Sequence, residues 1–311
     1  MKAIILKEFG GTDKLTYVDI PVPGISDDEV LIQVKAISIN PVDVRTRAGS
    51  AMASHLRNHN PLILGWDVSG TVETVGKNVT KFKAGDDVFG MVNFLGHGKG
   101  YAEFVAAPEL HLAIKPGNIS HQQASAATLA ALTVWQLIKP NITSGDRVLI
   151  QAASGGVGHF AVQIAKYLGA YVIGISSLKN RNFVLALGAD EHIAYDQVKF
   201  EDAVNDLDVV VDAFAFDNLY KSLKVVKPAG KIISLLPMIS DEVRAEAKAK
   251  NVEIQYQLVK SNGEDMEQIA TLLKNGQLVS HVSQVYPFSE MANAHLQVES
   301  GSTLGKVVVS L

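Results

Sequence analysis

A run of small residues follows an apolar segment near the middle of the chain. Residues 148–152 read VLIQA, and the next residues are Ala153, Ser154, Gly155, Gly156, Val157 and Gly158. Between a strand and a helix, this spacing is the dinucleotide-binding fingerprint G-x-G-x-x-G, with Ala153 in the first glycine position. Small residues let the backbone approach a pyrophosphate, and the following helix directs its positive dipole end at the phosphates. The sequence therefore predicts a dinucleotide site here; a tight turn without a ligand is the alternative.

The segment after the next apolar run indicates which dinucleotide is bound. An NAD site usually has an acidic residue about twenty residues after the glycine loop, which binds the ribose 2′-hydroxyl. No acid occurs here before Asp190, and hydroxyls and cations stand in that place instead: Ser176, Ser177, Lys179 and Arg181. These groups suit a 2′-phosphate, so we expect NADPH as the cofactor. The alternative is that Lys179 and Arg181 are only exposed at the start of a helix.

The elements around the glycine loop alternate between strands and helices. We predict strands over 147–152, 171–175, 207–212, 230–235 and 252–258. Helical patterns lie around 156–168, 180–187, 216–226 and 241–249. Such alternation predicts a doubly wound parallel sheet with helices on both faces.

The first hundred residues have a different pattern. Residues 29–37 read EVLIQVKAI, with an apolar period of two, and short strand-and-turn segments follow at 67–76, 87–92 and 101–107. Many short strands with glycine turns predict an antiparallel barrel or sandwich. An apolar helix over 124–138 separates the two parts. Near the end, a helix over 264–275 precedes a strand, GKVVVSL, which we expect to pair back with the N-terminal lobe.

Composition limits the classes of function. The chain has 311 residues, a net charge of −4 and no cysteine. Disulfides, thiolate zinc sites and a cysteine nucleophile are excluded, and a nucleic-acid partner is not expected at this charge. No apolar run reaches the length of a membrane span, and we expect no secretion signal at the N-terminus. We therefore expect a cytoplasmic protein.

A glycine-rich pattern in the N-terminal third resembles a known family. Its residues are Gly65-Trp66-Asp67-Val68-Ser69-Gly70-Thr71-Val72, Val75-Gly76, Val79, Phe82, Gly85-Asp86 and Val88-Phe89-Gly90. Further segments that agree are Asn40-Pro41-Val42-Asp43, the AASGGVG loop, Leu187-Gly188-Ala189-Asp190 and Gly305-Lys306-Val307-Val308. Together they resemble the medium-chain dehydrogenase/reductase superfamily, in its zinc-free quinone oxidoreductase (zeta-crystallin-like) and enone reductase branch.

The resemblance implies a fold and an assembly. It implies a GroES-like antiparallel β-barrel catalytic domain from residues 1–119 and 262–311, and a Rossmann domain from 120–261. The active site is then expected in the cleft between the domains. Homodimers are usual in this family, often through the last Rossmann strand, here near 252–258.

The resemblance also implies site residues. It places Asn40 and Asp43 near the nicotinamide as catalytic residues, where Asn40 would polarise a carbonyl oxygen. Turn formation is the alternative role of both. It further implies cofactor contacts by Thr133, Tyr195 and Lys306, each of which could instead be a packing or surface residue.

Two departures from the family pattern matter. Zinc-dependent relatives have Gly-His-Glu where this chain has Gly65-Trp66-Asp67, so we expect no metal. Relatives usually have glycines after the fourth Rossmann strand, whereas this chain has Phe214 and Phe216 there. These two aromatics could line the cleft, but we favour packing as their role.

The expected chemistry follows from the missing metal. Alcohol oxidation needs a group that stabilises an alkoxide, whereas a quinone or an α,β-unsaturated carbonyl spreads the charge of an added hydride onto an oxygen that a few hydrogen bonds hold. We therefore expect an oxidoreductase that transfers hydride from NADPH to a quinone or enone. The alternatives are a stand-alone enoyl-thioester reductase and a non-enzymatic NADPH-binding protein.

Overall fold

The computed structural model describes residues 1–311, which form two compact units. One unit comprises Met1–Leu132 together with Lys260–Leu311, and the other comprises Thr133–Val259. The chain leaves the first of these units after Leu132, whereas the expected boundary is after residue 119. Helix α3 (His121–Ala126) packs on strands of the first unit, so the chain leaves that unit only after Leu132.

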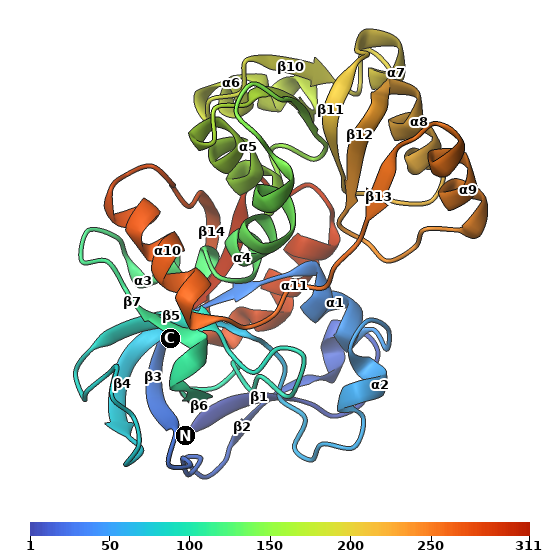
Figure 1. Ribbon diagram of the computed structural model, residues 1–311. Helices are drawn as coiled ribbons and strands as arrows, with labels where there is room; N and C mark the ends of the chain where they lie inside the picture. The colour runs from blue at the N-terminus through green and yellow to red at the C-terminus, as the bar shows by residue number, and fades with distance from the viewer. The chain divides into compact units, whose positions relative to one another are not determined.

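The second unit is built on a six-stranded, fully parallel sheet (Figure 1). The strand order is β10-β9-β8-β11-β12-β13, which is the doubly wound order with its reversal between β8 and β11. The strands are β8 (Arg147–Ile150), β9 (Tyr171–Ser176), β10 (Glu191–Ala194), β11 (Leu207–Asp212), β12 (Val226–Ser234) and β13 (Glu253–Gln255). The helices are α5 (Gly158–Tyr167), α6 (Arg181–Ala186), α7 (Phe200–Ala203), α8 (Asp217–Val225) and α9 (Asp241–Ala249).

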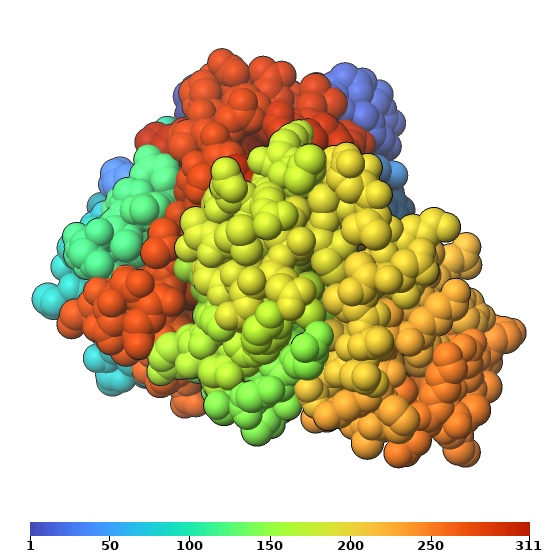
Figure 2. All heavy atoms as spheres, turned by 90° about the horizontal axis from the view of Figure 1, so that it is seen from above, coloured from blue at the N-terminus to red at the C-terminus, as the bar shows by residue number.

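The burial of its strands explains why this sheet is parallel. Leu149, Ile173, Val210 and Ile232 from four neighbouring strands are fully buried in one core cluster. Runs of β-branched residues buried on both faces are typical of parallel strands. Figure 2 shows the second unit, Thr133–Val259, coloured green to orange, as one continuous packed body.

The sheet contains one strand more than the five predicted. The additional strand, β10, has the sequence EHIA, and only its last two residues are buried. A strand this short and half polar gives no clear periodic pattern.

The first unit contains a two-stranded and a seven-stranded sheet. The smaller pairs β1 (Lys2–Leu6) with β2 (Leu15–Asp19). The larger has the order β14-β15-β3-β4-β5-β7, with β6 also paired to β3. Its strands are β3 (Glu29–Ile39), β4 (Asp67–Val75), β5 (Asp87–Met91), β6 (Phe104–Pro108), β7 (Leu112–Ile114), β14 (Val282–Pro287) and β15 (Lys306–Ser310). All pairs are antiparallel except β14 with β15.

The C-terminal strand returns to the N-terminal lobe, as predicted. Strand β15 pairs antiparallel with β3, and Val307 lies opposite Ile39. This pairing brings Lys306 next to the end of β3, where Asn40 begins helix α1 (Pro41–Arg47). The remaining helices of the unit are α2 (Ala53–Leu56), α4 (Leu129–Thr133, whose last residue begins the second unit), α10 (Gly263–Lys274) and α11 (Met291–Glu299).

The predicted helix over 124–138 is wrong as a single element. The structure has α3, then a break, α4 and a π-helical turn over Val134–Ile138. The Thr128 hydroxyl donates to the Ser125 carbonyl oxygen at 2.8 Å in the break, and such side-chain bonds to the backbone compete with helix continuation. No helix in residues 1–311 combines the length and the apolar character needed to cross a lipid bilayer.

Candidate functional site

A buried polar network in the first unit is centred on Asn40. Asn40 precedes Pro41, the first residue of α1, and is 2% exposed. Its backbone N–H donates to Oδ2 of Asp43 at 2.7 Å, which satisfies a free donor at the helix start. The turn-forming role therefore accounts for the backbone bond between Asn40 and Asp43.

The side-chain amide of Asn40 joins two buried charges. Its Nδ2 donates to Oδ2 of Asp67 at 2.7 Å. Its Oδ1 accepts a hydrogen bond from Lys306 Nζ, which also donates to the Ile39 carbonyl oxygen at 3.3 Å. Because one end of the amide faces a carboxylate and the other an ammonium, the orientation of the amide is fixed.

The carboxyl groups of Asp43 and Asp67 are both influenced by one buried cation, the ammonium of Lys306. Burial, and after it the charge of the nearby Asp67, raises the pKa of Asp43 to about 7, against the hydrogen bonds of Asn40 and the charge of Lys306. Burial also raises the pKa of Asp67 and lowers the pKa of Lys306. Two carboxylates beside one ammonium leave an unbalanced negative charge, so the site holds a proton near neutral pH.

Further buried groups surround this network. The Tyr101 hydroxyl lies 2.9 Å from Nε2 of His295, and both side chains are fully buried. Burial raises the pKa of Tyr101 well above its usual value and lowers the pKa of His295 to about 3, so both stay neutral. The Arg47 guanidinium pairs with Glu299 at 3.1 Å. Asp67, Tyr101 and His295 were not among the predicted site residues.

The glycine loop of the second unit is tightly packed between a strand and a helix. It connects β8 to α5, and Ala153 N–H donates to the Ile175 carbonyl oxygen at 2.8 Å, which ties it to β9. A Cβ at Gly158 would lie 2.1 Å from the Ala152 carbonyl oxygen, so only glycine fits. Apart from its chain neighbours, a Cβ added at Gly155 would meet only Ala152 within 4 Å, with the Ala152 carbonyl oxygen at 3.2 Å. These residues fit a dinucleotide phosphate group.

The segment predicted to bind the 2′-phosphate lies beside this loop. Asn180 Nδ2 donates to Oγ of Ser154 at 3.0 Å, so the two segments are bonded. Lys179 and Arg181 are exposed, whereas Ser176 and Ser177 are buried. The Ser176 hydroxyl is bonded to the Ser177 carbonyl oxygen and lies 2.8 Å from Nε2 of His192, so it already has protein partners.

The fold places an acidic residue, Asp196, against this segment, and the local sequence pattern did not predict it. Asp196, two residues beyond β10, accepts a hydrogen bond from the Leu178 N–H at 2.9 Å. It adds one negative charge beside the cations of Lys179 and Arg181. Tyr195 is 65% exposed, and its backbone N–H donates to the Ser176 carbonyl oxygen at 3.1 Å. Thr133 is buried at the end of α4.

The packing role expected for Phe214 and Phe216 is wrong. These residues follow β11, and they are 56% and 63% exposed. Ala215 between them is buried in the core instead. The backbone conformation of the turn, which the residue pattern does not specify, decides which side chain packs.

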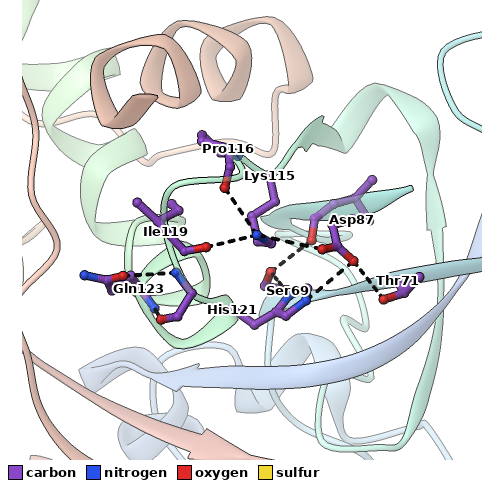
Figure 3. A network of polar contacts seen from close by, with 10 residues as sticks. Ser69, Thr71, Asp87, Lys115, Pro116, Ile119, His121 and Gln123 are labelled. Atoms are coloured by element: carbon purple, nitrogen blue, oxygen red, sulfur yellow. Dashed lines mark hydrogen bonds and ion pairs between the residues drawn. The ribbon is translucent and has the colours of Figure 1, made fainter. Parts of the chain in front are cut away.

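A serine, a histidine and an aspartate also meet on the first unit (Figure 3). Ser69 Oγ lies 2.8 Å from His121 Nδ1, and His121 Nε2 lies 3.5 Å from Oδ1 of Asp87. The Ser69 hydroxyl is fully buried and donates to the Val88 carbonyl oxygen at 3.0 Å. Lys115 Nζ donates to the carbonyl oxygens of Pro116 and Ile119 beside it. This cluster therefore joins β4, β5 and α3 and presents no nucleophile.

The residues at the family's zinc position do not fit the metal. Trp66 is buried, and its Nε1 donates to the Gly96 carbonyl oxygen at 2.8 Å. Both carboxylate oxygens of Asp67 accept protein hydrogen bonds, from Asn40 Nδ2 and from the Leu129 N–H. Within residues 1–311, no three histidine, cysteine, aspartate or glutamate side chains are grouped to hold an ion.

Comparisons with known proteins agree with this architecture. The family model of the alcohol dehydrogenase GroES-like domain matches residues 26–117, and that of the zinc-binding dehydrogenases matches residues 187–309. An NADPH-dependent alkenal/one oxidoreductase of Arabidopsis thaliana, described as chloroplastic, is 33% identical over 99% of this chain and 79% of its own length. A human quinone oxidoreductase is 30% identical over 100% of this chain and 98% of its own.

A solved structure extends the likeness to three dimensions. The quinone oxidoreductase from Coxiella burnetii has a TM-score of 0.94 and 35% identity, and the match covers 100% of this chain and 99% of that chain. Sequence and structure thus agree over the GroES-like unit and the parallel-sheet unit alike. The chain belongs to the medium-chain dehydrogenase/reductase superfamily, among its quinone and alkenal oxidoreductases.

Proposed function

We propose that this protein transfers hydride from NADPH to a quinone or another α,β-unsaturated carbonyl compound. The observation that carries the proposal is a dinucleotide loop, at Ala153–Gly158, in a chain whose zinc-ligand position is filled by Trp66 and Asp67. The relatives that match over nearly the whole chain are oxidoreductases of alkenals, enones and quinones, which supports the same reaction.

The protein's own task in this reaction is to bind and orient. NADPH, when bound, supplies the hydride. The backbone around Gly155 and the start of α5 hold the pyrophosphate, and Lys179 and Arg181 supply charge for the 2′-phosphate. Asn40 Nδ2 has two N–H hydrogens, of which Asp67 accepts one; the second donates to the acceptor's carbonyl oxygen as charge develops there.

The other predicted site residues have supporting roles in this proposal. Asp43 holds Asn40 through the backbone bond at the start of α1. Lys306 acts on Asn40 rather than on the cofactor, because its ammonium is buried against the Asn40 amide. Tyr195, which is exposed and bonded through its backbone to Ser176, would hold the adenosine end of the cofactor, and Thr133 would hold its nicotinamide end.

We further propose that the reaction needs no metal. Exhaustive treatment with a chelator should leave turnover unchanged, and metal analysis of the purified protein should find less than one zinc per ten chains. Stoichiometric zinc that is lost together with activity would overturn this proposal.

The protein is proposed to be a cytoplasmic homodimer. Strand β13 is at the edge of the parallel sheet and pairs only with β12, so its other side is open to a second copy. Light scattering after size exclusion should give twice the chain mass of 33.4 kDa. A tagged chain expressed in its own cell should fractionate with the cytoplasm.

An acceptor panel tests the reaction class. Oxidation of NADPH is followed with 1,4-benzoquinone, 9,10-phenanthrenequinone, 2-alkenals and an enoyl thioester. Turnover of quinones or alkenals supports the proposal. Preference for the thioester would make the protein an enoyl reductase, and NADPH binding without any turnover would make it a non-enzymatic binder.

A further inference from the structure

His192 on strand β10 contacts the segment that is proposed to bind the 2′-phosphate of NADPH. Its Nε2 lies 2.8 Å from the Ser176 hydroxyl oxygen, whereas its Nδ1 is buried and has no hydrogen-bond partner. A serine hydroxyl can accept as well as donate, so the ring can gain a proton and keep this bond. His192 is therefore a titratable group at the cofactor segment, and it was not among the predicted site residues.

The sheet register places His192 on the face that the dinucleotide loop covers. In the parallel pair of β9 with β10, His192 lies opposite Gly174. Alternate residues of a strand share a face, so Ser176, two residues after Gly174, points to the same side of the sheet as His192. A Cβ at Gly174 would lie 3.1 Å from the Cβ of Ala153, the first residue of the loop. The imidazole and the loop are therefore on one side of the sheet.

Two opposite charges act on this imidazole. Burial and then the charge of Arg181, at the start of α6, lower the pKa of His192 below its ordinary value of 6.5, whereas the charge of Asp196 raises it. The other charged or titratable side chains on the neighbouring elements are two bonded pairs and two expected cofactor residues: Tyr171 with Glu191, Lys166 with Asp190, and Lys179 and Tyr195. The ring is therefore neutral near pH 7 in the free protein.

Asp196 is an unfavourable neighbour for a 2′-phosphate. It accepts the Leu178 N–H at 2.9 Å, one residue before Lys179, so its negative charge lies at the segment itself. A carboxylate in this region usually selects NAD, because it accepts the ribose 2′-hydroxyl and repels a phosphate. Lys179 and Arg181 are exposed, so solvent and salt screen their charges. A preference for NADPH therefore requires more positive charge near Asp196 than these two residues supply.

We propose that His192 takes up a proton when the 2′-phosphate of NADPH binds, and that its positive charge then offsets Asp196 and favours NADPH over NADH. This proposal rests on the proposed function and deepens the part that concerns the cofactor. The proton comes from solvent and bonds to the ring nitrogen that lacks one, and Nε2 then donates to the Ser176 hydroxyl oxygen. A bound phosphate carries close to two negative charges, which favour the charged form of a nearby imidazole. NADH has no such group, so its binding takes up no proton at His192.

Affinities measured between pH 6 and pH 8 test this link. NADP⁺ and NAD⁺ replace the reduced cofactors, which decompose in mild acid, and they differ in the same 2′-phosphate. A group whose pKa rises on binding strengthens binding at low pH, and this effect is lost as the pH rises through the pKa of the complex. At pH 6 the wild type should bind NADP⁺ about 3- to 10-fold more tightly than His192→Gln, which corresponds to a pKa rise of up to about one unit. At pH 8 the two proteins should have equal Kd values.

The controls separate charge from hydrogen bonding. His192→Gln keeps an amide that can bond to Ser176 and carries no charge at any pH. NAD⁺ should bind the wild type and this variant equally throughout. His55→Gln, at an exposed position of α2 in the other unit, should behave like the wild type. The second ionisation of the phosphate, at a pKa of about 6, favours binding at high pH, but it affects every variant equally.

Proton uptake can also be measured on the wild-type protein itself. The Cε1–H NMR signal of His192, assigned by its loss in His192→Gln or His192→Asn, reports the charge of the ring. With saturating NADP⁺ its titration midpoint should move to higher pH by about one unit, because a negative charge has come near. With saturating NAD⁺ the midpoint should stay where it is in the free protein.

The outcomes distinguish this inference from the proposed function. A midpoint of His192 that NADP⁺ leaves unchanged would overturn the proton link, and so would equal NADP⁺ affinities of wild type and His192→Gln at pH 6. Neither result affects turnover of quinones or enones. If the wild type binds NADP⁺ but oxidises NADPH with no acceptor of the panel, the proposed function itself fails.

Discussion

The ammonium group of Lys306 hydrogen-bonds the side-chain oxygen of Asn40, although 266 positions separate the two residues. The pairing of β15 with β3 brings them together in the first unit. The bond leaves the Asn40 amide nitrogen facing Asp67, so a residue of the last strand sets the orientation of a residue in the first third of the chain. The proposed oxyanion donor therefore depends on an intact buried charge network.

Lys306→Met should destabilise the protein strongly. The substitution leaves Asp67 and Asp43 buried without their cation, and breaking a buried charge set in this way costs about 3–5 kcal/mol. The midpoint of denaturant unfolding should fall accordingly, and adding Asp67→Asn should restore part of the loss. Lys274→Met, at an exposed position of α10, is the matched control. Equal unfolding midpoints for Lys306→Met and the wild type would contradict the network.

Asn40→Ala should lower the rate of the chemical step more than it weakens NADPH binding. Loss of one preorganised donor to a developing oxyanion typically reduces kcat by about 10²–10³-fold. Single-turnover rates with a quinone and Kd for NADPH measure the two effects separately. If the variant only melts earlier, with unchanged kcat, Asn40 has the turn-forming role alone.

The stability of the wild type should fall between about pH 4 and pH 7 relative to Asp43→Asn. The folded pKa of Asp43, about 7, lies above its ordinary value of 3.8. In that interval the native state holds a proton that the unfolded state has released, so the stabilisation present below pH 3.8 is lost as the pH rises. The slope is at most about 1.4 kcal/mol per pH unit.

Urea unfolding at several pH values measures this difference. The comparison with Asp43→Asn removes the opposing contributions of His295 and His97, whose lowered pKa values act in the other direction. Asp241→Asn, at an exposed position, should run parallel to the wild type. A constant difference between wild type and Asp43→Asn from pH 4 to pH 7 would show that Asp43 does not hold the proton.

Lys179→Ala/Arg181→Ala should lose affinity for NADPH and keep affinity for NADH. Both cations are exposed, so we expect the lower part of the range for charged hydrogen bonds, which is about a tenfold increase in Kd for NADPH. The loss should shrink as salt rises. Lys224→Ala/Lys248→Ala, two exposed lysines of other helices, is the control. Equal weakening for both cofactors would assign these residues to the fold.

Asp196→Asn should have the opposite effect on NADPH affinity at the same segment. The amide oxygen can still accept the Leu178 N–H, while one negative charge near the 2′-phosphate disappears. NADPH should bind more tightly and NADH should bind unchanged. A loss of NADPH affinity would show that Asp196 does not face the phosphate.

Local patterns predicted the glycine loop and five of the six strands of the parallel sheet. The strand before Ala153, the small residues up to Gly158 and the helix behind them are adjacent in sequence, so periodicity and residue size specify them. Strand β15 was also predicted, because GKVVVSL is strongly apolar and follows the α/β segment. Strand β10 was missed because EHIA is short and half exposed.

The buried network could not be predicted because its members are distant in sequence. Asn40, Asp67 and Lys306 come from a helix start and two strands, and only sheet register brings them together. One signal was present: Asp67 is a carboxylate next to Trp66 at the start of an apolar strand. Likewise, the exposure of Phe214 depends on backbone angles that Asp212 and Gln151 fix, which no residue pattern expresses.

The most direct test of the account is the fate of the hydride. The protein is given NADPH labelled with deuterium at the transferred position of the nicotinamide, together with trans-2-hexenal, and the product is analysed by mass spectrometry and NMR. We expect hexanal with one deuterium on C3, because hydride is added to the conjugated carbon. Deuterium on C1 of 2-hexen-1-ol, or no deuterium in any product while NADPH is consumed, would contradict the account.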